Sequence, residues 1–558
     1  MMKAKLLAAL LVMMLLMFTA AAATAASSGF VLWVSPDGAR GVSAIDWYIS
    51  GRTCYLFIPG NTELSDLRVG FSGADEVTID GQTVAQGQSA AMLEPGGTYE
   101  VKVGKKTYAL AVMQGSPNLP ALYITTESGN LNAIHAKKTN KETGALIFVG
   151  PDGQVAYDGE LTHIKMRGNS STTFVKKSYQ IKLAIGANLC GMGKCRTWVL
   201  NANYRDKSHL RNQITFDMAM YAGLPATPEH ISAELYINNE YMGLYLFGEK
   251  IMIDDDRVDI RDLEAETEDL NELELSEYPL VGSKKAEAGK SKAYDIPVNP
   301  EDITGGYLLE YEYSVRYKDE PSAFTTTRKN TVVVKSPEYA SVEQMAYISS
   351  FMQTFENAIF SEGGVDPETG KHYGDLVDFD SLVAKYLVEE ICKNYDGNQS
   401  SMYFFKPADS QSVKAFAGPC WDYDSSYGSY AKERTARYLL NGKGLWIGNA
   451  TGGNYWWPAL YKQPDFYQAV TQTYASTFRP AMQILLGNGS DPEGTLLSLD
   501  EYAESLRSSA DMNIIRWPRH KNPTTVAQTG YTFDENIDFL KNFLAERVES
   551  LDELWLSE

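Results

Sequence analysis

Residues 391–424 read ICKNYDGNQSSMYFFKPADSQSVKAFAGPCWDYD, and this stretch decides the fold that we expect for the chain. A helix is predicted to end at its start, and an acidic loop with Asp396 follows. The apolar runs Met402–Phe405 and Val413–Ala417 flank a Pro-Ala-Asp turn and predict a β-hairpin. A second acidic loop, Trp421–Asp424, comes directly after it. Because both loops leave the same end of one hairpin, we expect their carboxylates to lie close together.

Two converging carboxylate loops are the arrangement that phosphoryl transfer needs. One carboxylate orients the attacking hydroxyl, and the other holds the divalent metal that bridges the phosphates of the donor. Protein kinases use this arrangement around the hairpin between their catalytic and metal loops. A second interpretation stays open, in which these carboxylates cap the hairpin or bind a structural calcium ion.

The upstream segments contain residues that suit phosphate binding. In the predicted strand Ser178–Leu183, side chains alternate between two faces, so Lys182 projects opposite the apolar residues. Arg167 and the Gly-Asn-Ser-Ser turn after it supply further donors, although they form no P-loop pattern. A predicted hairpin around residues 238–240 ends at Glu249, where a kinase hinge would meet adenine or ribose. An exposed basic strand is the alternative explanation for Lys177 and Lys182.

The chain divides into several predicted segments. Residues 29–115 are rich in short apolar runs between turn residues, which predicts a small β-sandwich-like module. Residues 120–255 are predicted to be rich in strands, with one helix over Asp206–Tyr221. Residues 261–300 are strongly acidic at first and predict a solvated insertion. Residues 340–555 are predicted to be mainly helical. The fold class is therefore α+β.

Composition and the N-terminus limit the function classes. The 558 residues include 50 Lys and Arg against 71 Asp and Glu, a net charge of −21, which argues against nucleic acid as the main partner. Lys3 and Lys5 precede the apolar run Leu6–Phe18 and the exit Ala23-Thr24-Ala25. This pattern predicts a signal peptide over residues 1–25 and a secreted or cell-surface protein without a transmembrane span in the mature chain. An uncleaved anchor is the alternative.

The oxidation state that we expect for the cysteines depends on this compartment. Five cysteines leave at least one unpaired within the chain. Cys190 and Cys195 flank a glycine-rich loop, so we expect a small disulfide between them, ahead of a zinc site. Cys392 and Cys420 have apolar neighbours and are predicted to be buried thiols.

The chain resembles the spore-coat protein H (CotH) kinase-like family over roughly residues 120–555. The matching segments occur in the family's order. They are Arg167–Ser170, Lys177–Leu183, Trp198 through Asn212, Glu234–Tyr245, Gly305–Glu310, Asn394–Asp396 and Trp421–Asp424.

The resemblance implies an atypical protein-kinase-like, two-lobed fold and phosphorylation of protein Ser residues that depends on ATP and Mg or Mn. It assigns Asp396 to the catalytic loop and Asp422 to the metal, with Asp424 as the second candidate. Lys182 matches the phosphate lysine, with Lys177 as the fallback.

The sequence departs from the family pattern at two points. The catalytic loop usually has Asn five residues after its Asp as a metal ligand, and Ser401 stands there. Asn398 could substitute only if the loop folds back. The helix expected over Asp206–Tyr221 has no Glu to pair with the lysine, and Asp217 is its better-placed acid.

A second function class remains open, a catalytically inactive kinase fold that acts as a secreted or surface binding module. The protein substrate of the first class is unknown, and the second class would bind a carbohydrate or surface partner. An aromatic cluster could serve that partner or could instead pack inside a large loop; it contains Trp446, Tyr455, Trp456 and Trp457.

Overall fold

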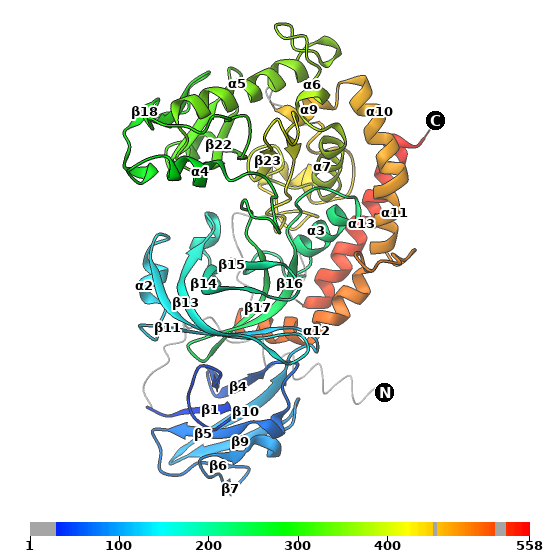
Figure 1. The fold of residues 1–558 in the computed structure, drawn as a ribbon. Coiled ribbons are helices and arrows are strands. Elements are labelled where there is room, and N and C mark those ends of the chain that lie inside the picture. The colour runs from blue at the N-terminus through cyan, green and yellow to red at the C-terminus, as the bar shows by residue number, and fades with distance from the viewer. Residues whose placement is uncertain (1–28, 450–454, 519–531, 558) are drawn as a thin grey trace. The chain divides into compact units, whose positions relative to one another are not determined.

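The computed structural model describes residues 29–449, 455–518 and 532–557, so the expected signal peptide at residues 1–25 lies outside it. The chain divides into two compact units (Figure 1). The smaller unit contains the described residues up to Ile58, together with Thr62–Gln114 and Asn239–Tyr241. The larger unit contains Pro59–Asn61, Gly115–Asn238 and the chain from Met242 onward.

The smaller unit consists of two sheets. The first has the order β2-β1-β5-β8, with bounds Ile45–Asp46, Val31–Ser35, Arg68–Ser72 and Gln88–Ser89. The second has the order β3-β4-β10-β9-β6-β7, with bounds Tyr48–Ser50, Thr53–Ile58, Lys106–Gln114, Thr98–Val103, Thr78–Ile79 and Gln82–Thr83. In β10, Leu110 and Val112 are buried and alternate with less buried residues, as a sheet with one covered face requires.

The larger unit begins with a closed seven-stranded barrel. Its order is β11-β12-β13-β14-β15-β17-β16, with bounds Ala121–Thr126, Lys141–Val149, Val155–Arg167, Ser178–Asn188, Lys194–Asn201, Glu240–Glu249 and His230–Ile237. A parallel pairing of β11 with β16 closes the barrel. Tyr179, Ile181 and Leu183 of β14 are buried in its interior. Gln180 and Lys182 therefore lie on its outer face.

The expected disulfide between Cys190 and Cys195 is wrong, because both thiols are free. Cys195 is buried in the core of the barrel, and its sulfur accepts a hydrogen bond from the Thr197 N–H at 3.4 Å. Burial raises the pKa of Cys190 to about 11. Cys392 and Cys420 are buried free thiols, as predicted.

A seven-stranded sheet forms the second layer of this unit. Its order is β18-β19-β21-β22-β20-β23-β24, with bounds Leu280–Gly282, Ser291–Tyr294, Ser322–Thr325, Thr331–Ser336, Tyr307–Glu312, Met402–Lys406 and Phe416–Ala417. The acidic segment 261–300 forms helix α4, Leu263–Asp269, and then supplies the sheet with β18 and β19.

Helices make up much of the rest of this unit. They are α3 (Arg211–Tyr221), α5 (Val342–Ile359), α6 (Tyr373–Leu376), α7 (Phe379–Cys392), α8 (Ala436–Leu439), α9 (Trp456–Leu460), α10 (Pro464–Thr473), α11 (Arg479–Leu485), α12 (Leu499–Arg516) and α13 (Phe533–Trp555). Helix α3 begins five residues later than predicted, because the Asp206 carboxylate accepts hydrogen bonds from the N–H groups of Ser208 and Arg211 and holds a turn before the helix.

The aromatic cluster proposed as a ligand surface is largely internal. Trp456 and Trp457 are 2% and 1% exposed and belong to the core of this unit, where Trp456 packs against Phe355 of α5 and Trp457 against Tyr386 of α7. They are therefore unavailable to a carbohydrate or surface partner, and the packed alternative is confirmed for these two residues. Among the described helices, none is both long and apolar enough to cross a membrane.

Candidate active site

The hairpin β23–β24 stands between the two acidic loops, as the sequence predicts. Phe404 pairs with Ala417 and Phe405 with Phe416. Helix α7 ends at Cys392, and the next residue, Lys393, has a φ of 48° that turns the chain into the loop containing Asp396. The second loop, Trp421–Asp424, follows β24 after three residues.

Asp396 has the environment of a general base. Its Oδ1 accepts a hydrogen bond from the Tyr313 hydroxyl at 2.7 Å. Burial raises the pKa of Asp396 to about 6, although this hydrogen bond lowers it, and repulsion from Asp424 and Glu312 raises it further. A base with a pKa near 6 is ionised at neutral pH and still accepts a proton readily.

Asp422 and Asp424 bring negative charge to one point. Asp422 is exposed and has a φ of 68°, an uncommon value for a residue other than glycine. The surrounding protein atoms displace water from the Asp422 carboxylate, and this raises its pKa well above the usual value. Repulsion from Asp424 and Asp396 raises the pKa further. Burial also raises the pKa of Asp424. A cation at this point would relieve the repulsion.

Arg167, at the end of β13, extends from the barrel to the second acidic loop. Its guanidinium lies 4.8 Å from the centre of the Trp421 ring, and its Nη1 donates to Asn201 Oδ1 at 2.9 Å. Burial lowers the pKa of Arg167, while Tyr403, Asp422 and Glu310 act in the opposite direction. Arg167 is thus a cation next to the metal-candidate aspartate.

Sequence reasoning missed several charged residues around this point. Lys250 follows β17, and burial and the charges of Arg167, Lys165 and Lys335 lower its pKa. Lys335 of β22 lies 3.7 Å from Glu310 and 3.1 Å from Glu320. Burial raises the pKa of Glu310 to about 7. These residues lie on separate strands, so only the alternation of β20 and β22 could have indicated them.

The other predicted residues lie in different surroundings. Lys182 is on the outer barrel face, opposite His163 of β13. Lys177 donates to the Thr172 carbonyl. Glu249 is 4% exposed and accepts from the Glu229 N–H at 2.9 Å, and burial raises its pKa to about 7.

Ser401 and the predicted acids of α3 have definite places as well. Ser401 has a φ of 57° and its hydroxyl lies 3.4 Å from that of Ser400. The Asn398 amide nitrogen donates to the Ile447 carbonyl at 3.1 Å, while its Oδ1 is buried and has no hydrogen-bond partner among the described residues. Asp217 pairs with His230 at 3.3 Å rather than with a lysine.

One buried network joins the two acidic loops. Glu389 of α7 accepts from Lys385 Nζ at 2.5 Å and from the Tyr423 hydroxyl at 2.7 Å through Oε1. Its Oε2 accepts from Asn394 Nδ2 at 2.9 Å, and Asn394 Oδ1 accepts from the Asp396 N–H at 3.1 Å. Glu389 therefore links the loop of Asp396 to the loop of Asp422.

The donors suit a nucleotide with its divalent metal. No group of three or more His, Cys, Asp or Glu side chains among the described residues could hold a metal ion by itself. A nucleotide-bound Mg or Mn ion takes part of its shell from phosphate oxygens and water, so one or two carboxylates suffice. Asp422 and Asp424 are the residues that could supply these carboxylates, and Arg167 and Lys250 are the neighbouring cations.

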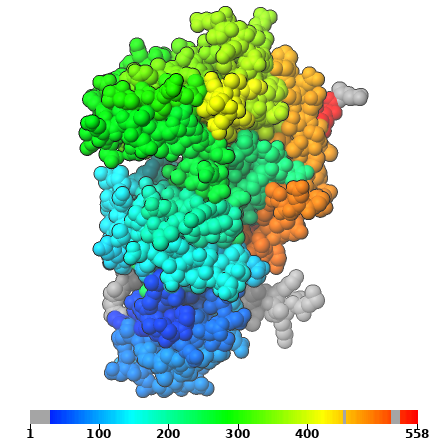
Figure 2. Space-filling model, in the orientation of Figure 1, coloured from blue at the N-terminus to red at the C-terminus, as the bar shows by residue number. Residues whose placement is uncertain are grey.

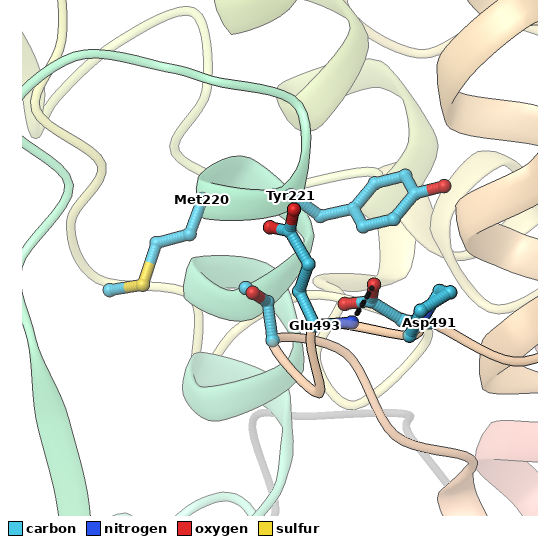
Figure 3. Close-up of a pocket in the computed structure, with 6 residues that line it drawn as sticks. Met220, Tyr221, Asp491 and Glu493 are labelled. Carbon is cyan, nitrogen blue, oxygen red and sulfur yellow. Dashed lines mark hydrogen bonds between the residues drawn. The ribbon is translucent and has the colours of Figure 1, made fainter.

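The surface has a recess and a separate cavity. Figure 2 shows a recess between the cyan surface of the barrel and the green surface of the seven-stranded sheet. A cavity of about 340 Å³ lies elsewhere, at the end of α3, and is lined by Met220, Tyr221, Asp491, Pro492, Glu493 and Thr495 (Figure 3). The Asp491 carboxylate there accepts from the Glu493 N–H at 3.1 Å. None of the candidate catalytic, metal-binding or phosphate-binding residues lines this cavity.

Comparison with known proteins decides the family. The sequence profile of the family described as CotH kinase protein matches residues 164–551, most of the chain. The chain belongs to the CotH kinase family. Asp396, Asp422 and Arg167 all fall within the matched range, and membership indicates a kinase-like function. A search of curated proteins finds no match.

Proposed function

We propose that this CotH family member is a secreted protein kinase that transfers a phosphoryl group from ATP to Ser residues of a protein substrate. The single observation that carries the proposal is the link through Glu389, which holds the loop of Asp396 beside the loop of Asp422 and Asp424. Under this proposal the barrel and the seven-stranded sheet with its helices are the two lobes of an atypical kinase-like fold, and residues 29–115 are a separate β-sandwich-like module.

The chain's own residues have distinct roles in this reaction. Asp396 accepts the proton of the substrate Ser hydroxyl while the Ser oxygen attacks the terminal phosphorus of ATP. The bond between that phosphorus and the bridging oxygen breaks, and ADP leaves with that oxygen. Asp422 and Asp424 would hold Mg or Mn, which neutralises the charge on the phosphates when bound. Arg167 and Lys250 would bind phosphate oxygens, while Lys182 lies farther along the barrel face.

Ligand binding to the full mature chain tests this proposal. A thermal-shift titration with ATP and Mn²⁺ should raise the melting temperature, because ligand at a hundred times its dissociation constant adds about 2.7 kcal/mol of stability. Asp422→Ala should abolish the rise, and Asp396→Asn should retain it while losing phosphate transfer.

Ser401→Asn should strengthen Mn²⁺ binding by about tenfold, because an amide oxygen is the better ligand and Asn tolerates a positive φ. Ser410→Asn, in the exposed hairpin turn, is the matched control.

A second function is favoured by one observation, the serine at position 401. A catalytically inactive kinase fold that serves as a surface binding module would show no nucleotide-dependent rise in melting temperature, either in the wild-type chain or in Asp422→Ala. If the wild-type chain and Asp422→Ala both stay folded and neither responds to ATP with Mn²⁺, the kinase proposal fails.

A further inference from the structure

Four basic side chains form a block on the outer face of the barrel. Lys141 of β12 stands directly opposite Lys165 of β13, and His163 of β13 stands directly opposite Lys182 of β14. Lys141 and Lys165 are like charges directly opposite each other on neighbouring strands, which destabilises a sheet. None of the four takes part in an ion pair among the residues that the structure describes. The block thus concentrates positive charge in a chain whose net charge is −21.

The imidazole at the centre of the block has an unused polar atom. Nε2 of His163 is buried and, within the described part of the chain, has no hydrogen-bond partner. Burial and then the charges of Lys165, Lys141 and Lys182 lower the pKa of His163 to about 4, so the ring is neutral. The Glu338 carboxylate raises the pKa of Lys165, against the larger effect of burial, which lowers it. A buried polar atom without a partner is costly, and in the tautomer with the proton on Nε2 the neutral ring would donate a hydrogen bond to an anion bound beside it.

The block continues the row of residues that reaches the candidate active site. Ile164 and Met166 of β13 point into the barrel, so His163, Lys165 and Arg167 share the outer face. At about 3.3 Å per residue, Lys165 and His163 lie roughly 7 and 13 Å along the strand from Arg167. This is the length of two to four residues of an extended peptide. Three lysines around one imidazole, on three strands, suit the tetrahedral oxygens of a phosphate dianion.

We propose that Lys141, His163, Lys165 and Lys182 bind a phosphoserine of the protein substrate, two to four residues from the Ser that is to be phosphorylated. The inference rests on the proposed kinase function and adds a substrate class, namely segments with closely spaced Ser residues. Phosphoryl transfer to a hydroxyl must supply the first phosphate, so one round of the reaction creates the preferred substrate of the next.

The experiment compares peptides that differ only in one phosphate. Each peptide has one acceptor Ser and, two, three or four residues to either side, a Ser or a phosphoserine. The full mature chain should phosphorylate the best phosphoserine peptide with a kcat/KM at least about tenfold higher than its Ser counterpart. Lys141→Gln with Lys182→Gln should bring this ratio close to one. Lys284→Gln with Lys290→Gln removes two exposed lysines elsewhere on the same unit and should leave the ratio unchanged.

A binding measurement separates this inference from the kinase proposal. Fluorescence anisotropy with a labelled phosphoserine peptide that has Ala at the acceptor position needs no catalysis, and the block variant should weaken its binding about tenfold. If no peptide is phosphorylated but this loss of binding occurs, the docking site stands and the kinase proposal fails. If the wild-type chain binds the phosphorylated and unphosphorylated peptides equally, the inference is overturned. If the block variant weakens ATP·Mn binding but not peptide binding, the block serves the nucleotide and the inference is also overturned.

Discussion

At the scale of single residues, the protonation of Asp396 governs the expected pH dependence. Burial raises the pKa of this carboxyl to about 6, and the Tyr313 hydroxyl acts to lower it. A base works only when deprotonated, so kcat/KM should rise with pH through about 6 and be about tenfold lower at pH 5 than at pH 7.5. Tyr313→Phe removes the hydrogen bond and should move this acidic limb upward.

The control for this prediction is Tyr467→Phe, which removes a hydroxyl from a ring that is 40% exposed and far from the acidic loops in sequence. This control variant should leave the acidic limb of the pH profile of kcat/KM at the same pH. A profile that is flat between pH 5 and 7.5, or a limb that Tyr313→Phe moves downward, would show that Asp396 is not the base.

At the scale of elements, the sequence was informative where neighbours in the chain are also neighbours in space. The β23–β24 hairpin and its two acidic loops could be predicted because one short segment contains them all. Barrel closure could not, because β11 pairs with β16, more than a hundred residues away, and alternation in a strand does not name its partner. Lys250, Lys335 and Glu310 were missed for the same reason. The disulfide expectation failed because spacing cannot show that Cys195 points into a core.

The network on helix α7 gives a prediction that separates positioning from stability. Lys385 and Glu389 are both buried and paired, so removing one partner leaves an uncompensated charge and should cost about 3–5 kcal/mol of unfolding free energy. Lys385→Met should show this loss in urea unfolding. Lys385→Met with Glu389→Leu should recover most of the stability, because an apolar pair can replace a buried ion pair.

Activity should not recover with stability in that double variant. Asn394 and Tyr423 lose their common acceptor, so the Asp396 loop and the Asp422 loop are no longer tied together. We expect phosphate transfer at least about tenfold below wild type in a protein of nearly wild-type stability. Full activity in the stable double variant would refute the positioning role of Glu389.

At the scale of the whole molecule, buried carboxyls set how stability changes with pH. Burial raises the pKa of Glu234 to about 8, and burial raises those of Glu249, Glu264 and Glu310 to about 7. Between about pH 4.5 and these values, the folded chain keeps protons that the unfolded chain has lost. The unfolding free energy therefore falls as pH rises across this window. His163, whose pKa burial lowers to about 4, opposes the trend between that pH and about 6.5, and Lys393, whose pKa burial lowers to about 7, opposes it above pH 7. The four carboxyls outnumber these two groups.

The melting temperature of the chain without ligands should accordingly be higher at pH 5.5 than at pH 8, by several degrees. Glu234→Gln should reduce the difference by about 2 °C or more, because it removes one such carboxyl while Ser509 can still donate to the amide oxygen. Glu160→Gln, an exposed residue of β13 that pairs with Ala145 of β12, removes the same charge and should leave the difference unchanged. A melting temperature that rises from pH 5.5 to pH 8 would contradict the prediction. Adding ATP with Mn²⁺ at pH 8 should then recover stability in the wild-type chain but not in Asp422→Ala, because the cation is held by carboxylates that are costly to ionise without it.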